Sequence, residues 1–314
     1  MNYPISASNQ TRSALDVMVV GEALIDVVSA DGRRAEYPGG SPANVAYGLA
    51  RLGVNTGLLT AIGPDAWGSR LEDHLGNAGV RVLPGSRSLT RTASATATLA
   101  PDGSAHYDFD IVWDLAPQTP YCFPKILHTG SIATFLDPGA GVVKSLLQQA
   151  HRHCVVTYDP NIRPALLGSH REATSIFEEL VTFTDVVKLS SEDAQWLYPG
   201  KSVDETAAHI LGLGAGLAVV TLGSEGSYFS TAGFDAGIPA AAAKVADTIG
   251  AGDAFMSALI FGLLNRGTEG FPPAVLEQLG RTAAAAAAIT VQRPGANPPS
   301  LAELNAVLES QRVG

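Results

Sequence analysis

The sequence is poor in the features that mark several large classes of protein. It has only two cysteines, Cys122 and Cys154, and no CxxC pair, so a thiolate zinc site and a CxxC redox motif are excluded. We expect both cysteines to be reduced thiols, and a disulfide between them is the alternative. The longest apolar run, around 283–289, falls short of the ~18 residues that a membrane span needs. The polar opening lacks a signal-peptide pattern, so we expect a cytoplasmic protein that makes no membrane contact.

Positive charge is also scarce. The 314 residues hold 20 Lys and Arg against 30 Asp and Glu, which gives a net charge of -10 without a basic stripe. Duplex nucleic acid requires such a basic surface, so we expect no nucleic-acid partner. A small anionic ligand stays compatible with this charge, because a few local donors can dominate a cleft.

The chain does contain a regular alternation of strand and helix patterns. Val17–Val20 is a continuous apolar run, typical of a strand inside a parallel sheet. Amphipathic stretches at 42–52 and 67–77, each followed closely by glycine, are typical of helices. Further strands are expected at 57–63, 126–130, 154–159, 185–189 and 217–222, and further helices at 141–150, 172–182 and 204–213. The alternation predicts an α/β fold with a mostly parallel sheet covered on both faces.

Two segments, 27–37 and 92–110, interrupt the alternation. They combine β-branched and polar residues with the turn dipeptides Asp31-Gly32 and Asp102-Gly103, a pattern typical of hairpins. We expect them to form a small β lid over a cleft, and surface decoration is the alternative. No repeat or linker divides the chain, so we expect a single domain over residues 1–314 with lid segments at about 27–38 and 92–112.

The segment DTIGAGDAF, residues 247–255, places small residues immediately before a buried helix. Backbone amides that converge at such a helix start attract anions. Asp253 lies in the first turn. It either caps the helix or takes a proton from a hydroxyl while the amides stabilise a transferring phosphoryl group.

The segment GGSPANVAYGLARLG, residues 39–53, also joins glycines to a helix start. Gly39 and Gly40 permit close approach of the backbone to a ligand, and Asn44 can donate and accept hydrogen bonds. An ordinary turn before a helix is the alternative. Neither segment is GxxxxGK[ST], and no GxGxxG follows a strand, so P-loop NTPases and dinucleotide dehydrogenases are poor fits.

Together the two segments resemble the paired signatures of the ribokinase-like, PfkB-type carbohydrate kinases. The segments GEALIDV, DPNIRPAL, KLSSED, VTLGSEGS and QRPGAN follow in the order of that family, so the resemblance covers nearly the whole chain. It implies a three-layer α/β/α fold with a β lid over a sugar site. It also implies transfer of the γ-phosphoryl group of ATP to a sugar hydroxyl with Mg²⁺, in a protein that often forms a homodimer through the lid.

The resemblance implies a role for each matching residue. Asp253 would be the general base, with the backbone of 249–252, which includes Gly250, Ala251 and Gly252, as the anion hole. The sugar would contact Asp26, Gly39, Gly40, Asn44 and Arg163, and the nucleotide would contact Lys188, Thr221, Gly223 and Gly226. Arg163 would face the substrate or the phosphates, and a structural salt bridge to Asp159 or another acid is the alternative.

Two acidic residues are candidates for binding cations, and one of them lies where the sequence departs from a motif of the family. The NxxE element of several relatives reads KLSSED here, with Ser190 or Lys188 in place of asparagine and Glu192 or Asp193 as the acid. Glu192 is the candidate for the metal shell. Asp247 would hold a monovalent cation such as K⁺ or cap a turn.

The motif GGSPAN has Ser-Pro where ribokinases proper have lysine, and it resembles fructokinase-like and 2-keto-3-deoxygluconate kinase-like members. We therefore expect an ATP-dependent fructokinase. The alternatives are 2-keto-3-deoxygluconate, another sugar or a nucleoside as the acceptor. A catalytically silent sensor that binds sugar or nucleotide is the alternative from another class of protein.

Overall fold

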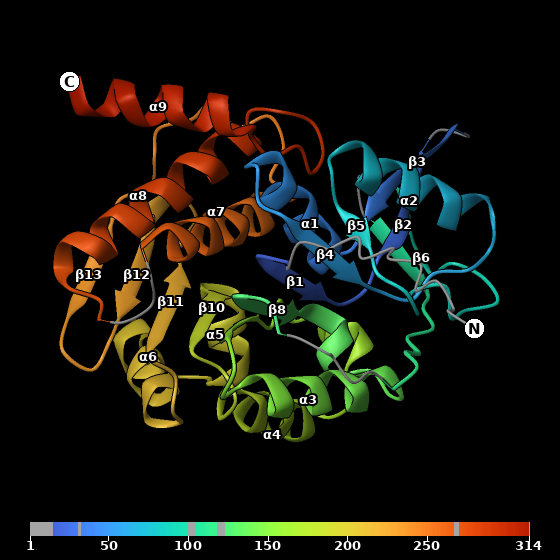
Figure 1. The fold of residues 1–314 in the computed structure, drawn as a ribbon, viewed down its shortest axis with the longest axis horizontal. Helices are drawn as coiled ribbons and strands as arrows, with labels where there is room; N and C mark the ends of the chain where they lie inside the picture. The colour runs from blue at the N-terminus through green and yellow to red at the C-terminus, as the bar shows by residue number, and fades with distance from the viewer. Residues whose placement is uncertain (1–14, 31–32, 100–104, 118–122, 267–269, 314) are drawn as a thin grey trace, which may run out of the picture.

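The computed structural model describes residues 15–30, 33–99, 105–117, 123–266 and 270–313, and Figure 1 shows a large central sheet between two layers of helices. The strands of this sheet lie in the order β13-β12-β11-β10-β9-β8-β1-β4-β5. Their bounds are β1 Val17–Val20, β4 Thr56–Leu59, β5 Arg81–Val82, β8 Ile126–Gly130, β9 Val155–Asp159, β10 Val186–Ser190, β11 Leu217–Thr221, β12 Ser227–Ser230 and β13 Asp235–Ile238. From β11 to β5 neighbouring strands are parallel, and β12 and β13 add an antiparallel edge.

Helices cover both faces of the sheet, so both faces are buried. Successive side chains of a strand point to opposite faces and therefore enter different cores. In β1, Val17 and Val19 join one hydrophobic core, whereas Met18 and Val20 join the other. The first core packs against α1 Ser41–Arg51, α2 Ala66–Asn77, α7 Ala251–Arg266, α8 Pro273–Thr290 and α9 Leu301–Val313. The second packs against α3 Gly139–Ala150, α4 His170–Val181, α5 Ser191–Leu197 and α6 Val203–Gly212. This is the predicted three-layer α/β/α fold.

A second, four-stranded sheet stands beside the large one, with α2 against it (Figure 1). It consists of β2 Leu24–Ala30, β3 Arg33–Gly39, β6 Ser94–Leu99 and β7 Ala105–Asp110, in the order β3-β2-β6-β7. The pairs β2/β3 and β6/β7 are antiparallel, so both predicted hairpins are confirmed. The predicted turns Asp31-Gly32 and Asp102-Gly103 lie outside the described residues, as does Cys122.

Three short helical turns, η1 Ser131–Thr134, η2 Pro164–Leu166 and η3 Gly223–Glu225, follow the carboxyl ends of parallel strands. Ligands of open parallel sheets bind at this edge. The segments that follow β8, β9, β10 and β11 lie at this edge of the sheet, where we expect the predicted substrate and nucleotide sites.

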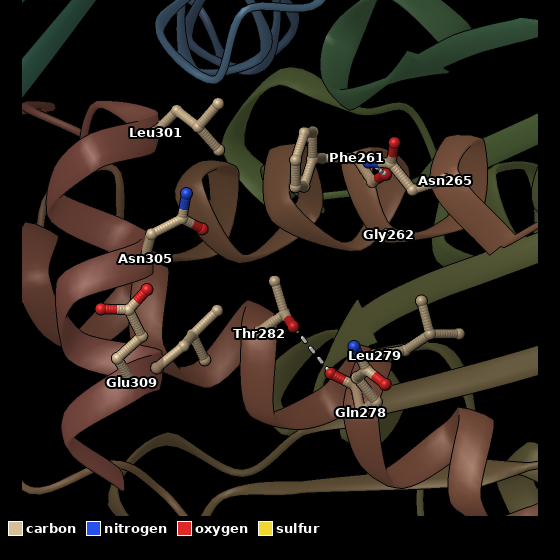
Figure 2. Close-up of a pocket in the computed structure, with 10 residues that line it drawn as sticks. Phe261, Gly262, Asn265, Gln278, Leu279, Thr282, Leu301, Asn305 and Glu309 are labelled. Atoms are coloured by element: carbon tan, nitrogen blue, oxygen red, sulfur yellow. Dashed lines mark hydrogen bonds between the residues drawn. The ribbon is translucent and has the colours of Figure 1, made fainter. Parts of the chain in front are cut away.

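The helix α9 packs against α8, and residues of α7, α8 and α9 line a groove of about 660 Å³ (Figure 2). Its polar side chains include Asn265, which donates to the carbonyl of Phe261, and Thr282, which donates to the carbonyl of Gln278. Both side chains therefore bond to carbonyl groups of their own helices. The residues predicted for catalysis and binding lie outside the lining of this groove.

Two smaller observations bear on the expectations from composition. Cys154 is a free, half-buried thiol whose pKa is raised to about 11 by burial, so it is a poor nucleophile at neutral pH. Within the described ranges, no helix is both long enough and apolar enough to cross a membrane.

Candidate active site

Asp253 lies in the first turn of α7 and meets the start of α1, which is more than 200 residues earlier in the chain. Ser41 Oγ donates to its Oδ1 at 2.7 Å, and Asn44 Nδ2 donates to its Oδ2 at 2.9 Å. Burial raises the pKa of Asp253, against the opposing effects of these two hydrogen bonds and of nearby cationic charge. A positioned carboxylate with a raised pKa is a better proton acceptor. Ser41 was not predicted as a site residue.

The predicted glycine pair has a steric cause at each position. A Cβ on Gly39 would lie 2.0 Å from Oδ2 of Asp26, so only glycine leaves room for this carboxylate. Gly40 has φ +97°, and a Cβ there would lie 2.5 Å from the carbonyl oxygen of Glu22. The pair therefore turns the chain from β3 into α1 and lets Asp26 on β2 face the same region as Asn44.

Asp26 and Arg163 belong to one electrostatic group with Asp253. Burial raises the pKa of Asp26 to about 6, with the charge of Arg163 lowering it and that of Asp253 raising it. The exposed Arg163 guanidinium donates to the carbonyls of Asn161 and Ile162. The alternative for Arg163, a salt bridge to Asp159, is wrong, because Asp159 pairs with a lysine instead.

That lysine is Lys188, on the strand next to Asp159. Its Nζ donates to Asp159 Oδ2 at 2.8 Å, and both side chains are at most 5% exposed. Burial lowers the pKa of Lys188, but the charges of Asp159, Asp193 and Asp253 raise it overall. A Cβ added to Gly252 would lie 3.2 Å from the same Nζ. A protonated amine therefore lies directly against the start of α7.

Two of the four amides in the predicted anion hole have hydrogen-bond partners within the loop. The amide of Ile249 donates to Asp247 Oδ1 at 3.0 Å, and the amide of Ala251 donates to the carbonyl of Thr248 at 3.3 Å. Gly250 has φ +76°, and a Cβ there would lie 2.7 Å from Ala296. The amides of Ile249 and Ala251 therefore have partners within the loop, and the anion hole over 249–252 stays a prediction, with the amides of Gly250 and Gly252 as its foremost donors.

A cavity of about 800 Å³ opens beside Lys188 and the start of α7. Its lining includes seven of the residues that the sequence assigned to nucleotide, metal or anion: Lys188, Glu192, Thr221, Gly223, Gly226, Ala251 and Gly252. Gly226 has φ +106°, and a Cβ there would lie 2.0 Å from the carbonyl of Ile238, which explains a glycine at this turn. A volume of this size suits a small-molecule cofactor or substrate.

The ambiguous KLSSED stretch is resolved by a capping box at the start of α5. Ser190 Oγ accepts from the amide of Asp193, and Asp193 Oδ2 accepts from the amide of Ser190. Asp193 Oδ1 also accepts from the amide of Ile162, so this carboxylate is committed to the fold. Glu192 is exposed on the cavity and stays the predicted acid for a metal shell.

Two carboxylates bear on whether Mg²⁺ fits here. Asp159 Oδ1 is buried and has no hydrogen-bond partner among the described residues, whereas Glu192 lines the cavity. Mg²⁺ in phosphoryl transfer keeps several waters and uses one or two carboxylates together with substrate phosphates. The residues present fit that requirement.

Asp247 has a structural role that accounts for its position. It accepts from the amide of Ile249 and, at 2.7 Å, from the amide of Gly295, which lowers its pKa. It thus joins the loop before α7 to the loop before α9. This geometry favours turn capping over the alternative of a monovalent-cation ligand.

Glu22, which was not predicted as a site residue, is a buried carboxyl group close enough to Asp253 to be affected by its charge. It is 4% exposed, and its Oε2 accepts from the amide of Ala133 at 3.3 Å. Burial raises its pKa to about 8, and the charge of Asp253 adds to the shift. Ser131, which also bonds to Glu22, has φ +56° and begins the turn after β8. Glu22 therefore fixes this turn mainly as the neutral acid at pH 7.

We expect the free energy of unfolding to fall between about pH 5 and pH 8 because of Glu22. In this window the native carboxyl keeps its proton and the unfolded one loses it, so the native state binds more protons. The free energy of unfolding then falls by up to about 1.4 kcal/mol per pH unit. Urea unfolding of the native protein and of Glu22→Gln, which stays neutral, measures this. Equal pH dependence in both proteins would contradict the assignment.

Asp253, a buried carboxyl group that can accept a proton, lies at the start of α7 beside Ser41 and Asn44, and the adjoining cavity of about 800 Å³ is large enough for a nucleotide. The fold and this arrangement define a phosphotransferase whose acceptor is an alcohol. The sequence profile described as pfkB family carbohydrate kinase matches residues 14–303, so the chain belongs to that family and is a carbohydrate kinase.

Three known proteins are similar to it over most of their length. A fructokinase of Rhizobium leguminosarum bv. trifolii is 31% identical, with 79% of each chain covered. An ATP-dependent 6-phosphofructokinase of Thermoanaerobacterium thermosaccharolyticum is 29% identical over 79% of this chain and 81% of its own. The crystal structure of a fructokinase with bound ATP from Xylella fastidiosa superposes with a TM-score of 0.82 at 27% identity, covering 95% of this chain and 99% of that one. The predicted family and fold are confirmed.

Proposed function

We propose that the protein transfers the γ-phosphoryl group of ATP to a hydroxyl of a neutral sugar, and that the sugar is D-fructose. The observation that carries the proposal is the placement of Asp253. Ser41 and Asn44 hold its carboxylate at the start of α7, where it interacts electrostatically with both Asp26 and Lys188. Similarity to a structure with bound ATP supports ATP as the donor.

The chain's own groups divide the reaction between them. Asp253 takes the proton of the attacking hydroxyl, which makes the oxygen nucleophilic as it approaches phosphorus. The amides of Gly250 and Gly252 and the Lys188 amine stabilise negative charge on the transferring group. Mg²⁺, held at the phosphates with Glu192 and Asp159, would neutralise phosphate charge when bound.

Charge around the acceptor pocket favours a neutral sugar. Asp26 and Asp253 place two carboxyl groups there, and the charge of Arg163 acts on both. A sugar phosphate would add negative charge beside these acids, whereas a ketose brings only hydroxyls. A carboxylate can accept hydrogen bonds from two hydroxyls at once. Similarity to fructokinases supports fructose among the neutral sugars.

One observation favours a second candidate, 2-keto-3-deoxygluconate. The exposed guanidinium of Arg163 has a planar donor arrangement that matches a substrate carboxylate. A sugar acid would then place its carboxylate on Arg163 and its hydroxyls on Asp26.

A coupled assay of ADP release with Mg²⁺ and ATP tests the proposal on fructose, ribose, glucose, tagatose, adenosine, fructose 6-phosphate and 2-keto-3-deoxygluconate. We expect kcat/KM to be highest for fructose. In Arg163→Met, which removes the charge but keeps an apolar stem, turnover of fructose should suffer less than turnover of the sugar acid. A preference for another acceptor would discard fructose and keep the kinase. A folded protein that binds nucleotide but turns over no acceptor would favour the silent sensor.

A further inference from the structure

The alanine run of α8, residues 283–288, has two faces with different surroundings. One set points into the hydrophobic core and is at most 1% exposed: Ala283, Ala285 and Ala286. The other set lines the 800 Å³ cavity together with the next residue at helical spacing: Ala284, Ala287, Ala288 and Val291. Positions i, i+3, i+4 and i+7 of a helix form one continuous strip. The run is therefore one smooth, apolar wall of the cavity.

The facing wall has the same character. It is the irregular segment 240–243, four consecutive alanines between β13 and α7; the exposed Lys244 comes next, and Val245 after it lines the cavity again. Val245 is 61% exposed and lies at the cavity, so a flat ligand between the walls would cover it. Phe255 of α7 also lines the cavity. Apolar walls of this kind bind a planar ring by removing its faces from water.

The charged and amide side chains of the cavity lie at its other end. Asn161, Lys188, Glu192 and Asp193 follow or belong to β9 and β10, whereas α8 contacts β12 and β13. The strand order puts β10 and β13 three spacings apart, about 14 Å. The polar end suits phosphates, so the alanine end is left for the base of the donor.

One hydroxyl between these ends points to a ligand independently of the alanines. Ser227 opens β12, opposite Thr221 of β11, and lines the cavity. It is 2% exposed, and its Oγ has no hydrogen-bond partner among the described residues. A buried hydroxyl without a partner is costly, and a bound polar group would satisfy it.

These observations bear on which nucleotide the cavity accepts. Adenine and guanine differ at position 6, where one carries an amino donor and the other a carbonyl acceptor. Side chains that separate them are amides, carboxylates and guanidinium groups, and those of this cavity lie at the phosphate end. A serine hydroxyl accepts from the amino group or donates to the carbonyl equally well.

We propose that the cavity holds the donor's purine between two alanine walls without distinguishing 6-amino from 6-oxo purines, so that GTP and ITP serve as donors as well as ATP. The inference rests on the proposed function for the assignment of the cavity to the phosphoryl donor. It adds the class of donor, which is a purine nucleoside triphosphate rather than ATP alone.

Direct binding separates this inference from the kinase reaction. Calorimetric titration with MgADP and MgGDP gives the two dissociation constants, whatever the acceptor sugar is. An apolar pocket discriminates weakly, whereas a site built to hydrogen-bond one edge discriminates by about 10⁴-fold or more. We expect the two constants to agree within about thirtyfold. A larger preference for MgADP, or no binding of MgADP, would overturn the inference, whereas failure of the sugar assay alone would overturn only the proposed function.

A matched pair of variants on α8 tests the wall itself. Ala287 is half-buried and lines the cavity, and Ala274 is exposed in the first turn of the same helix. Ala287→Leu should weaken both nucleotides together by at least about fivefold, because the added side chain fills the space for the base. Ala274→Leu should leave both constants unchanged. Unchanged binding in a folded Ala287→Leu, or a loss for one purine only, would overturn the assignment.

Discussion

Replacement of Asp253 by asparagine is expected to lower kcat by at least about 10²-fold while sugar and nucleotide still bind. Asparagine has the same shape, and its amide oxygen can still accept from Ser41 Oγ, which lies 2.7 Å from the native carboxylate. It cannot take a proton from the sugar hydroxyl. The loss should therefore appear in turnover rather than in the dissociation constants, measured by calorimetry. A variant that keeps more than about a tenth of native kcat would remove Asp253 from the role of base.

The variant Ser41→Ala is the control for Asp253→Asn, and its pH–rate profile is the measurement. The hydrogen bonds from Ser41 and Asn44 favour the charged form of Asp253 and lower its pKa against the effect of burial. Ser41→Ala removes one of them, so the pKa of Asp253 should rise and the acid limb of the kcat profile should move to higher pH. The base is still present in this variant, so activity should return as the pH rises. In Asp253→Asn no pH should restore it.

The fold was predictable because its parallel strands are buried on both faces and read as continuous apolar runs. The predicted strands Val17–Val20 and Ile126–Gly130 have the same bounds as β1 and β8 in the structure. The edge hairpin of β12 and β13 was missed. Its strands SYFS and DAGI mix serine, glycine and aspartate with few apolar residues, and one face of β13 is exposed. Edge strands carry a weaker hydrophobic pattern than central ones.

The site was predictable only where one short segment carries the chemistry. The glycines before α1 and α7 need backbone conformations or close approaches that leave a local sequence signal, as at Gly40 and Gly250. Contacts between distant segments leave none. The bond from Ser41 to Asp253 spans 212 residues, and Glu22 acquires its environment from the turn after β8. The bond from the amide of Ile249 to Asp247 was not predictable either, because it depends on the path of the loop.

The sequence around Lys188 already indicated a buried ion pair. It stands in the apolar run VVKLS, where a buried amine requires a negative partner. The partner is Asp159, which ends the neighbouring run VVTYD, and the parallel register of Tyr158 with Val187 brings the two side chains together. Sequence alone does not give the strand order, so Arg163, four residues from Asp159, was the more obvious partner.

The buried pair of Lys188 and Asp159 leads to the second large expected effect, on both stability and turnover. Lys188→Met leaves Asp159 buried without its cation, and we expect the free energy of unfolding to fall by about 3–5 kcal/mol at pH 7. The penalty should shrink on acidification, because burial already raises the pKa of Asp159 to about 6 and the loss of Lys188 raises it further. Urea unfolding at about pH 5 and pH 7.5 measures the difference.

The double variant Lys188→Met/Asp159→Asn separates stability from catalysis. It removes both charges, so most of the lost stability should return, as expected when a buried pair is replaced as a whole. Turnover should not return, because the variant lacks both Lys188 Nζ, which lies beside Gly252 and supplies positive charge where the phosphoryl group is transferred, and Asp159, one of the two carboxylates proposed to hold Mg²⁺. We expect kcat of the double variant to stay at least about 10²-fold below native. Native kcat in a stable double variant would make the pair purely structural, and the phosphates would then have to be stabilised by the amides and the metal alone.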